Sequence, residues 1–546
     1  MRTFTRISSR QPCRLYLTHH PSQISPANLV SLSGTARPVK ESKALKTGRG
    51  FTTIAPASDA QAQRRWPNSL LTLAIETSCD DTCVAVLEKE RTEAPFGATP
   101  RARLLFEERV TADNRAYGGI HPLAASESHM VALAPLVQKA TACLPSGKPD
   151  FVSATRGPGM GSSLASGLSV AKGLAVAWQV PLVGVHHMQA HALTPRLVEA
   201  LDAAKTAAAA ASTSSAATPT TPTTPTTPPL VSFPYLSFLV SGGHTMLVHS
   251  RALNDHRILA SAANIAVGDL LDKCARAILP RGFIAAAEAS AGRSLPYGAI
   301  LEAFAFEGQD TETYSGYRYP RQRCDEMAPF ESGHGWRLEA PLSSGVLRHA
   351  LRFDFSGLNG AVIKAAGGDP HMVPGGPGRV PKVPKSTGPP AGPKIPLPES
   401  ERRLLARGTM QLAFEHLASR LLLALKTGAG GGGGEGRDAP PTCLVVSGGV
   451  ASNQFLRYIL RSALEVHRYG HLPVVAPPPS LCTDNAAMIA WAGMEMYEAG
   501  WQSDLTMLPI RKWSMDADAE DGGILGPDGW VQKRVQWRNK KRYPLS

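Results

Sequence analysis

Two histidines one helical turn apart are the residues of this sequence best suited to chemistry. His187 and His191 are separated by three residues, so on a helix their side chains project from one face. A divalent metal ion can bridge such a pair, and Asp484 in the run CTDN (482–485) can supply a third, oxygen ligand. His186 fits less well, because it lies five positions before His191 and the two rings would point to different faces of a helix. The spacing indicates an open metal site, and the alternative is a pair of structural histidines.

Glycine-rich turns are a second chemical feature. The runs SGGHT (241–245) and SGGV (447–450) each follow an apolar stretch. Residues without a Cβ let backbone N–H groups approach phosphate oxygens, although hairpins also use glycine where nothing binds. Two such turns favour a nucleotide site. Asp272, in a helical segment opened by Gly268, could accept hydrogen bonds from ribose hydroxyls or could pair with a basic neighbour.

An alternation of strands and helices must position these residues. Apolar segments predict strands at 71–76, 83–87, 103–110 and 151–154, and helical periodicity predicts helices at 127–143, 162–178 and 187–199. The pattern then restarts, with strands at 235–240, 245–249, 257–260, 444–446 and 474–476 and helices after Gly268 and from Asn453 and Asp484. This repeat predicts an α/β protein of two similar lobes with a cleft between them.

Shifts in composition give the expected domain boundaries. The first 40 residues are basic and contain no acid, which is typical of a mitochondrial transit peptide, with a retained basic arm as the alternative. We expect a transit peptide and disordered spacer at 1–66, a first lobe at 67–200 completed by a helix at 484–500, an Ala/Thr/Pro linker at 201–230, a second lobe at 231–483 with disordered insertions at 367–398 and 428–437, and a basic C-terminal extension at 501–546.

Charge and cysteine usage narrow the class of protein. The 546 residues carry a formal net charge of +13, which favours a polyanionic partner. Basic residues interleaved with Trp537 and Tyr543 could contact RNA or form a solvated tail. The eight cysteines include no CxxC pair, so neither a zinc ribbon nor a disulfide framework is indicated. No apolar run approaches the roughly 20 residues of a membrane-spanning helix, so we expect no membrane association.

The ordered motifs of the chain resemble those of the tRNA N6-adenosine threonylcarbamoyltransferases, in particular the mitochondrial members. The resemblance covers about residues 71–500 and is carried by IETSCDDT (75–82), GGIHP (118–122), RGPG (156–159), HHMQAH (186–191), SGGHT (241–245), FSGL (355–358), SGGVASN (447–453) and CTDN (482–485). It implies a fold of the actin, Hsp70 and sugar-kinase type, with two ribonuclease H-like lobes and an active-site cleft between them. Asp81 and Gln189 stand where the family usually has Glu, Asn359 stands where it usually has Lys, and the segment around Gly298 is altered.

The resemblance also implies a reaction. Members transfer a threonylcarbamoyl group from threonylcarbamoyl-AMP to N6 of adenosine 37 in tRNAs that read codons beginning with A, and AMP is released. For this chain the resemblance implies mitochondrial tRNAs as substrates, a location in the mitochondrial matrix, and a separate synthase that supplies the adenylate. It further implies one divalent metal ion per subunit, iron or zinc, and it is compatible with a homodimer.

Site residues follow from the same resemblance. The metal ligands would be His187, His191 and Asp484, and Asp80 or Asp81 would receive the proton of the attacking amine. The adenylate would contact a set of residues from the second lobe, namely Leu239, Val240, Ser241, Gly242, Gly243, Asp272, Gly298 and Asn453.

Two other activities stay open at the level of the sequence. An ATP-binding phosphotransferase of the actin and sugar-kinase type would share the fold and the glycine turns, but it would bind magnesium through carboxylates and phosphates. A metallopeptidase would use the paired histidines, yet zincins place Glu directly after the first histidine, where this chain has Met188. Metal content and the nucleotide product distinguish these activities from the transferase.

Overall fold

The computed structural model describes most of the chain from Arg65 to Lys533. The described residues are 65–91, 99–114, 117, 120–213, 229–292, 295–306, 314, 316–368, 397–428 and 439–533. The predictions of a transit peptide, of disordered insertions at 367–398 and 428–437 and of a basic tail beyond Lys533 therefore fall almost entirely outside the described residues.

A seven-stranded sheet forms the first lobe, in the order β14-β13-β5-β4-β1-β2-β3. Strands β1 (Ser69–Glu76), β2 (Asp81–Glu90) and β3 (Ala102–Thr111) are antiparallel neighbours. Strand β4 (Phe151–Gly157) runs parallel to β1, and β5 (Leu182–His186) runs parallel to β4. The helices of this lobe are α1 (Pro122–Ala142), α2 (Gly161–Trp178), α3 (His187–Thr213) and α11 (Ala486–Glu498).

Helices cover both faces of this sheet. On β1, Leu71, Leu73 and Ile75 belong to a core that includes residues of α1 and α2. The alternate residues Leu70 and Ala74 pack into a second core with α3 and α11. Because successive strand residues point to opposite faces, a strand covered on both sides is apolar at nearly every position. This explains why the strand pattern of the sequence reads as a continuous apolar run.

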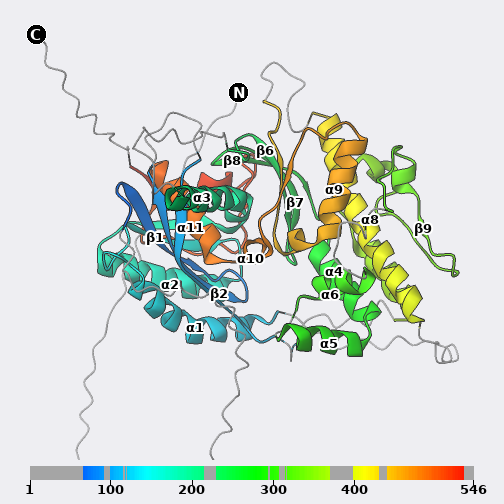
Figure 1. Cartoon of the computed structure of the whole chain (residues 1–546), viewed down its shortest axis with the longest axis horizontal. Coiled ribbons are helices and arrows are strands. Elements are labelled where there is room, and N and C mark those ends of the chain that lie inside the picture. The colour runs from blue at the N-terminus through cyan, green and yellow to red at the C-terminus, as the bar shows by residue number, and fades with distance from the viewer. Residues whose placement is uncertain are drawn as a thin grey trace, which may run out of the picture. The chain divides into compact units, whose positions relative to one another are not determined.

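The second lobe repeats the strand order of the first, whose strands β1 and β2 and helices α1, α2 and α3 are labelled in Figure 1. Its five-stranded sheet has the order β12-β11-β6-β7-β8, with β6 (Tyr235–Val240), β7 (Thr245–Ala252) and β8 (Asp255–Ser261) antiparallel. Strands β11 (Leu444–Ser447) and β12 (Val474–Val475) follow in parallel on the other side of β6. The order matches β5-β4-β1-β2-β3 element by element, so the predicted fold class of duplicated ribonuclease H-like lobes is confirmed.

A helical layer packs on the second sheet. It consists of α4 (Val267–Ile278), α5 (Arg281–Ala291), α6 (Tyr297–Ala305), α7 (Ser356–Ala365), α8 (Glu399–Lys426), α9 (Gln454–Val466) and the short α10 (Pro479–Cys482). A small hairpin of β9 (Phe330–Glu331) and β10 (Arg337–Leu338) and the 3-10 helices η3 (Asp325–Met327), η4 (Val346–His349) and η5 (Gly449–Ser452) connect them. The long helix α8 lies in the centre of this core, since 17 of its residues are buried.

Two expected boundaries are wrong. The linker expected at 201–230 begins as helix, because α3 continues through its alanine-rich part to Thr213. Alanine has the highest intrinsic helix propensity, so a composition too poor to form a core still extends a helix. Residues 501–533 are not a separate extension, because β13 (Trp501–Ser503) and β14 (Trp530–Gln532) add to the edge of the first sheet, with η6 (Gly523–Leu525) between them.

No helix in the described part of the chain combines the length and the apolar character that crossing a bilayer requires.

Candidate metal centre and substrate site

The two histidines lie where strand β5 passes directly into helix α3. His187 is the first residue of the helix and His191 follows one turn later, so their rings lie 4.7 Å apart between centroids. Asp484 comes from the connection between α10 and α11. Its Oδ1 lies 3.1 Å from His191 Nε2 and 3.5 Å from His187 Nε2. One ligand atom of each residue lies within 4.8 Å of the others, so the structure brings together the three predicted ligands.

A second carboxylate orients His187. Glu76 is fully buried at the end of β1, and its Oε2 lies 3.2 Å from His187 Nδ1. A proton on Nδ1 satisfies this contact and leaves the lone pair of Nε2 directed towards Asp484. Metal-binding histidines commonly have such a carboxylate behind them. Two nitrogen donors and one oxygen donor, with a carboxylate behind one histidine, form a donor set that fits a zinc or iron ion and would leave further coordination positions open to substrate.

Charge is balanced within this cluster. Burial lowers the pKa of His187, but the carboxylates of Asp484 and Glu76 raise it by more, so the net pKa is about 9. Burial raises the pKa of Asp484, yet His187 and His191 hold it well below its usual range. A cation bound to Nε2 of His187 displaces a proton, so we expect metal affinity to fall on acidification.

The predicted adenylate-binding turn lies between two glycines of other elements. A Cβ on Gly448 would lie 2.4 Å from the carbonyl oxygen of Val240, and Gly448 has a φ of +97°. A Cβ on Gly268, at the start of α4, would lie 2.6 Å from the carbonyl oxygen of Ser241. Only residues without side chains permit these approaches. Gly242 itself is exposed and has open space on its Cβ side, so the turn can present its backbone to a ligand.

Asp272 and Gly298 meet beside this turn. Asp272 lies on α4 and accepts a hydrogen bond from the backbone N–H of Gly298 in α6. Burial raises the pKa of Asp272 to about 6. Asn453 differs, because its Oδ1 caps α9 by accepting from Leu456 N at 2.9 Å and its side chain is buried. The structure therefore gives Asn453 a helix-capping role, and its contact with the adenylate stays a prediction.

The metal cluster and the glycine turns belong to one site. Burial and the positive charges of His187 and His191 lower the pKa of His244, in the β6–β7 turn, to about 4. A Cβ on Gly449 would lie 3.7 Å from Cγ2 of Thr483, next to Asp484. Residues of both lobes therefore converge on the predicted ligands.

Comparison with known proteins agrees with this geometry. A family model described as tRNA N6-adenosine threonylcarbamoyltransferase matches residues 105–217 and 212–491. The chain belongs to the tRNA N6-adenosine threonylcarbamoyltransferase family. This confirms the family predicted from the sequence motifs.

Members of the family match over most of the chain. A relative from Schizosaccharomyces pombe, named mitochondrial tRNA N6-adenosine threonylcarbamoyltransferase, is 34% identical over 482 residues, which cover 87% of this chain and 91% of the relative. The transferase of Novosphingobium aromaticivorans is 30% identical, with 82% of this chain and 97% of the relative covered. That of Zymomonas mobilis is also 30% identical, with 83% and 94% covered.

The proton acceptors predicted for the threonylcarbamoyltransferase reaction lie at the β1–β2 turn. Asp80 accepts a hydrogen bond from Asn114 Nδ2 at 2.9 Å, and Asp81 accepts one from the hydroxyl of Thr111. Burial raises the pKa of both carboxyls, that of Asp81 to about 7, and the charge of Asp484 raises both further. The role of Asp80 or Asp81 as proton acceptor stays a prediction.

The sequence analysis assigned no role to three residues of this threonylcarbamoyltransferase site, namely Glu76, His244 and Arg109. Glu76 gave a signal, because it is the one charged residue of the apolar strand β1. His244 stood within a quoted motif but carried no assigned role. Arg109 gave no signal at all, although its Nη1 donates to the hydroxyl of Thr483 and to the carbonyl oxygen of Asp484.

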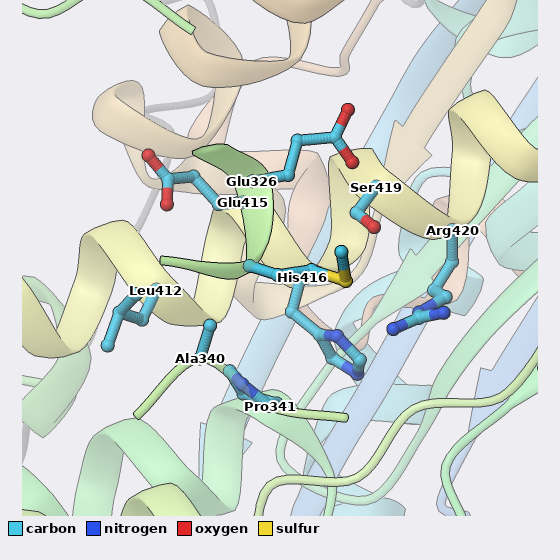
Figure 2. Close-up of a pocket in the computed structure, with 9 residues that line it drawn as sticks. Glu326, Ala340, Pro341, Leu412, Glu415, His416, Ser419 and Arg420 are labelled. Atoms are coloured by element: carbon cyan, nitrogen blue, oxygen red, sulfur yellow. The ribbon is translucent and has the colours of Figure 1, made fainter. Parts of the chain in front are cut away.

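A small cavity in the second lobe lies apart from these residues (Figure 2). The space that the centre of a water molecule can occupy in this cavity is about 10 Å³. Its lining includes Glu326, Glu415, His416, Ser419 and Arg420. A cavity of this size holds one water molecule, not an adenylate. The hydroxyl of Tyr317 donates to Glu415 at 2.6 Å, and burial raises the pKa of Glu415 to about 7. We interpret this as a structural network within the threonylcarbamoyltransferase fold.

Proposed function

We propose that this protein transfers the threonylcarbamoyl group of threonylcarbamoyl-AMP to N6 of adenosine 37 in mitochondrial tRNAs that read codons beginning with A. The amine nitrogen forms a bond to the carbamoyl carbon, the bond from that carbon to the phosphate oxygen breaks, and AMP leaves. The observation that carries the proposal is the convergence of the His187, His191 and Asp484 cluster with the glycine turns of the second lobe.

Residues of the second lobe would hold the leaving nucleotide. Within the turn at 241–243, Ser241 N donates to the carbonyl oxygen of His244 and Gly243 N donates to Ser241 Oγ, so the exposed Gly242 is the residue that would present its backbone N–H to a phosphate oxygen. Asp272 accepts a hydrogen bond from Gly298 and has a further oxygen for a ribose hydroxyl. These contacts fix the adenylate in one orientation, and since the adenylate is already activated, such positioning supplies much of the rate.

His187, His191 and Asp484 would hold one divalent ion, iron or zinc. When bound, such an ion supplies Lewis-acid chemistry and a template for substrate oxygens. The chain's own carboxylates complete the site, because Asp81 can take the proton that the attacking amine loses. Glu76 keeps the ring of His187 in its orientation throughout.

Substitution of the ligands tests this proposal. His187→Ala and Asp484→Ala should each abolish transfer and lower the metal content of the folded protein, because each removes a donor from the cluster without removing apolar core volume. The control is His471→Ala, an exposed histidine between α9 and β12, which should retain activity and metal. Full transfer by a metal-depleted double variant would contradict the assignment, and magnesium-dependent release of ADP would instead favour the phosphotransferase.

The partners and location follow as further proposals. A separate synthase supplies the adenylate, and the protein acts in the mitochondrial matrix, for which the support is the basic N-terminal composition and the name of the S. pombe relative. Import of a fluorescent fusion of residues 1–66 into mitochondria would test the location.

We also propose a homodimer, supported by apolar side chains that α1 exposes. Leu123 is 75% exposed, Met130 69% and Val131 71%. Leu123 and Met130 lie two helical turns apart and so share one face of α1, and exposed apolar side chains on one face are typical of an interaction surface. Light scattering should show a dimer for the wild-type protein and a monomer for Met130→Glu, and a monomeric wild-type protein would contradict the proposal.

A further inference from the structure

Arg109 links strand β3 to the segment between α10 and α11, which is far from it in sequence. It lies on β3, opposite Cys83 of β2, and its side chain is 30% exposed. Its Nη1 donates to the hydroxyl oxygen of Thr483 and, at 3.2 Å, to the carbonyl oxygen of Asp484. A single guanidinium thus contacts Thr483 and Asp484, the two residues before Asn485, which caps α11.

The backbone around Asp484 is held from several sides. Its carbonyl oxygen also accepts from Cys83 Sγ at 3.7 Å, a donor on the strand beside Arg109. Asn485 donates from Nδ2 to the carbonyl oxygen of Thr483 at 2.8 Å and caps α11 with its Oδ1. Since the carboxylate of Asp484 must lie near both histidines, groups that fix its backbone also fix the geometry of the cluster.

The charge of Arg109 suits this position. Its Nη1 lies 3.8 Å from Oδ2 of Asp81, and its positive charge acts on Glu107 and Asp484 as well. Without this positive charge, the carboxylates of Asp81, Glu107 and the ligand Asp484 would repel one another. A neutral donor at residue 109 could make the hydrogen bonds but would not offset this repulsion.

Thr483 carries the contact on to the second lobe. A Cβ on Gly449 would lie 3.7 Å from Cγ2 of Thr483, so the threonine lies against the glycine turn that follows β11. Displacement of Thr483 would therefore disturb the ligand Asp484 and this turn together.

We propose that Arg109 is a positioning residue for the metal centre. It holds the segment of Thr483 and Asp484 so that the carboxylate stays aligned with His187 and His191 and the threonine stays against the second lobe. The proposal rests on the metal-binding part of the proposed function, but not on the identity of the transferred group.

Cobalt binding to the full-length protein tests the proposal without tRNA or adenylate. Co²⁺ serves as the probe, because its visible spectrum reports ligand geometry and a titration gives its affinity. The variants are Arg109→Gln, Arg109→Lys and Thr483→Val. The control is Arg101→Gln, which removes a partly exposed arginine that pairs with Glu90 just before the same strand.

We expect Arg109→Gln to weaken Co²⁺ binding about 10–100-fold, the usual effect of losing a residue that orients a ligand, and to alter the spectrum. Arg109→Lys should recover part of the affinity, since it keeps the charge but not the planar donor group. Thr483→Val should weaken Co²⁺ binding too. The double variant with Arg109→Gln should bind Co²⁺ no more weakly than the weaker-binding single variant, because both substitutions remove the same contact between Arg109 and Thr483. Arg101→Gln should bind as the wild type does.

Unchanged Co²⁺ affinity and spectrum in folded Arg109→Gln would overturn the proposal, even if its melting temperature fell, because that pattern marks a purely structural role. An equal loss in Arg101→Gln would overturn it as well. Failure of the proposed function looks different: if the wild-type protein binds Co²⁺ but does not modify tRNA, the transferase assignment falls while the role of Arg109 is still measured.

Discussion

Replacement of Glu76 by Gln should weaken metal binding while preserving the fold. Glu76 is fully buried, and its Oε2 lies 3.2 Å from His187 Nδ1. It also accepts hydrogen bonds from Ser78 N and from the hydroxyl of Thr155. Glutamine has nearly the same size, so the substitution removes the charge and changes one acceptor into a donor without opening a cavity.

The magnitude follows from the tautomer of His187. An amide nitrogen in place of Oε2 would donate to Nδ1, which moves the imidazole proton to Nε2. Nε2 is the atom that lies 3.5 Å from Asp484, and once protonated it offers no lone pair to an ion. Loss of a carboxylate behind a metal-bound histidine typically weakens binding about 10–100-fold, or roughly 1.4–2.7 kcal/mol.

Competition with a chelator measures this effect. Wild-type protein and Glu76→Gln are titrated with Zn²⁺ in the presence of an indicator, and bound metal is counted by mass spectrometry. The matched control is Glu88→Gln, since Glu88 is an equally buried carboxylate of the same sheet that pairs with Arg103 instead. Wild-type Zn²⁺ affinity in folded Glu76→Gln, or an equal loss in Glu88→Gln, would refute the reasoning.

Two further predictions concern the second lobe. Gly448→Ala should cost about 1–3 kcal/mol of stability in urea unfolding and reduce transfer, because a Cβ there meets backbone and φ is positive, whereas Gly243→Ala has open space and should fold as the wild type does; equal stability of the two variants would contradict this. The pKa of Glu415 is raised from 4.5 to about 7, so its contribution to stability is present at low pH and is lost as pH rises through about 7. Glu415→Gln should therefore be more stable than the wild type at pH 8, by up to about 3 kcal/mol, and should lose that advantage at pH 4, and a pH dependence identical to that of the wild type would count against it.

Local patterns were sufficient to predict the central elements. The hairpins β1–β2 and β6–β7 follow from apolar runs closed by short turns, and the pairing of His187 with His191 follows from helix periodicity alone. Residue types made Asp484 a candidate ligand, but helix spacing could not place it beside the histidines, because it lies 293 positions after His191. Spacing along one helix is encoded locally, but a ligand from another element depends on the whole fold.

The remaining features depend on contacts that no local pattern encodes. Arg109 and Thr483 are separated by 374 residues, and a lone arginine on a strand usually indicates a solvated position. The capping role of Asn453 depends on α9 beginning at Gln454, one residue after the helix start that we predicted. The strands β13 and β14 have three residues each, too few to show a period of two.

Analysis of tRNA nucleosides tests the central claim most directly. Metal-loaded protein is mixed with unmodified mitochondrial tRNA and threonylcarbamoyl-AMP, and the digested nucleosides and released nucleotide are identified by mass spectrometry. We expect N6-threonylcarbamoyladenosine at position 37 together with AMP, and neither product from Asp484→Ala. The absence of the modified nucleoside with folded, metal-loaded wild-type protein would contradict the proposed transfer.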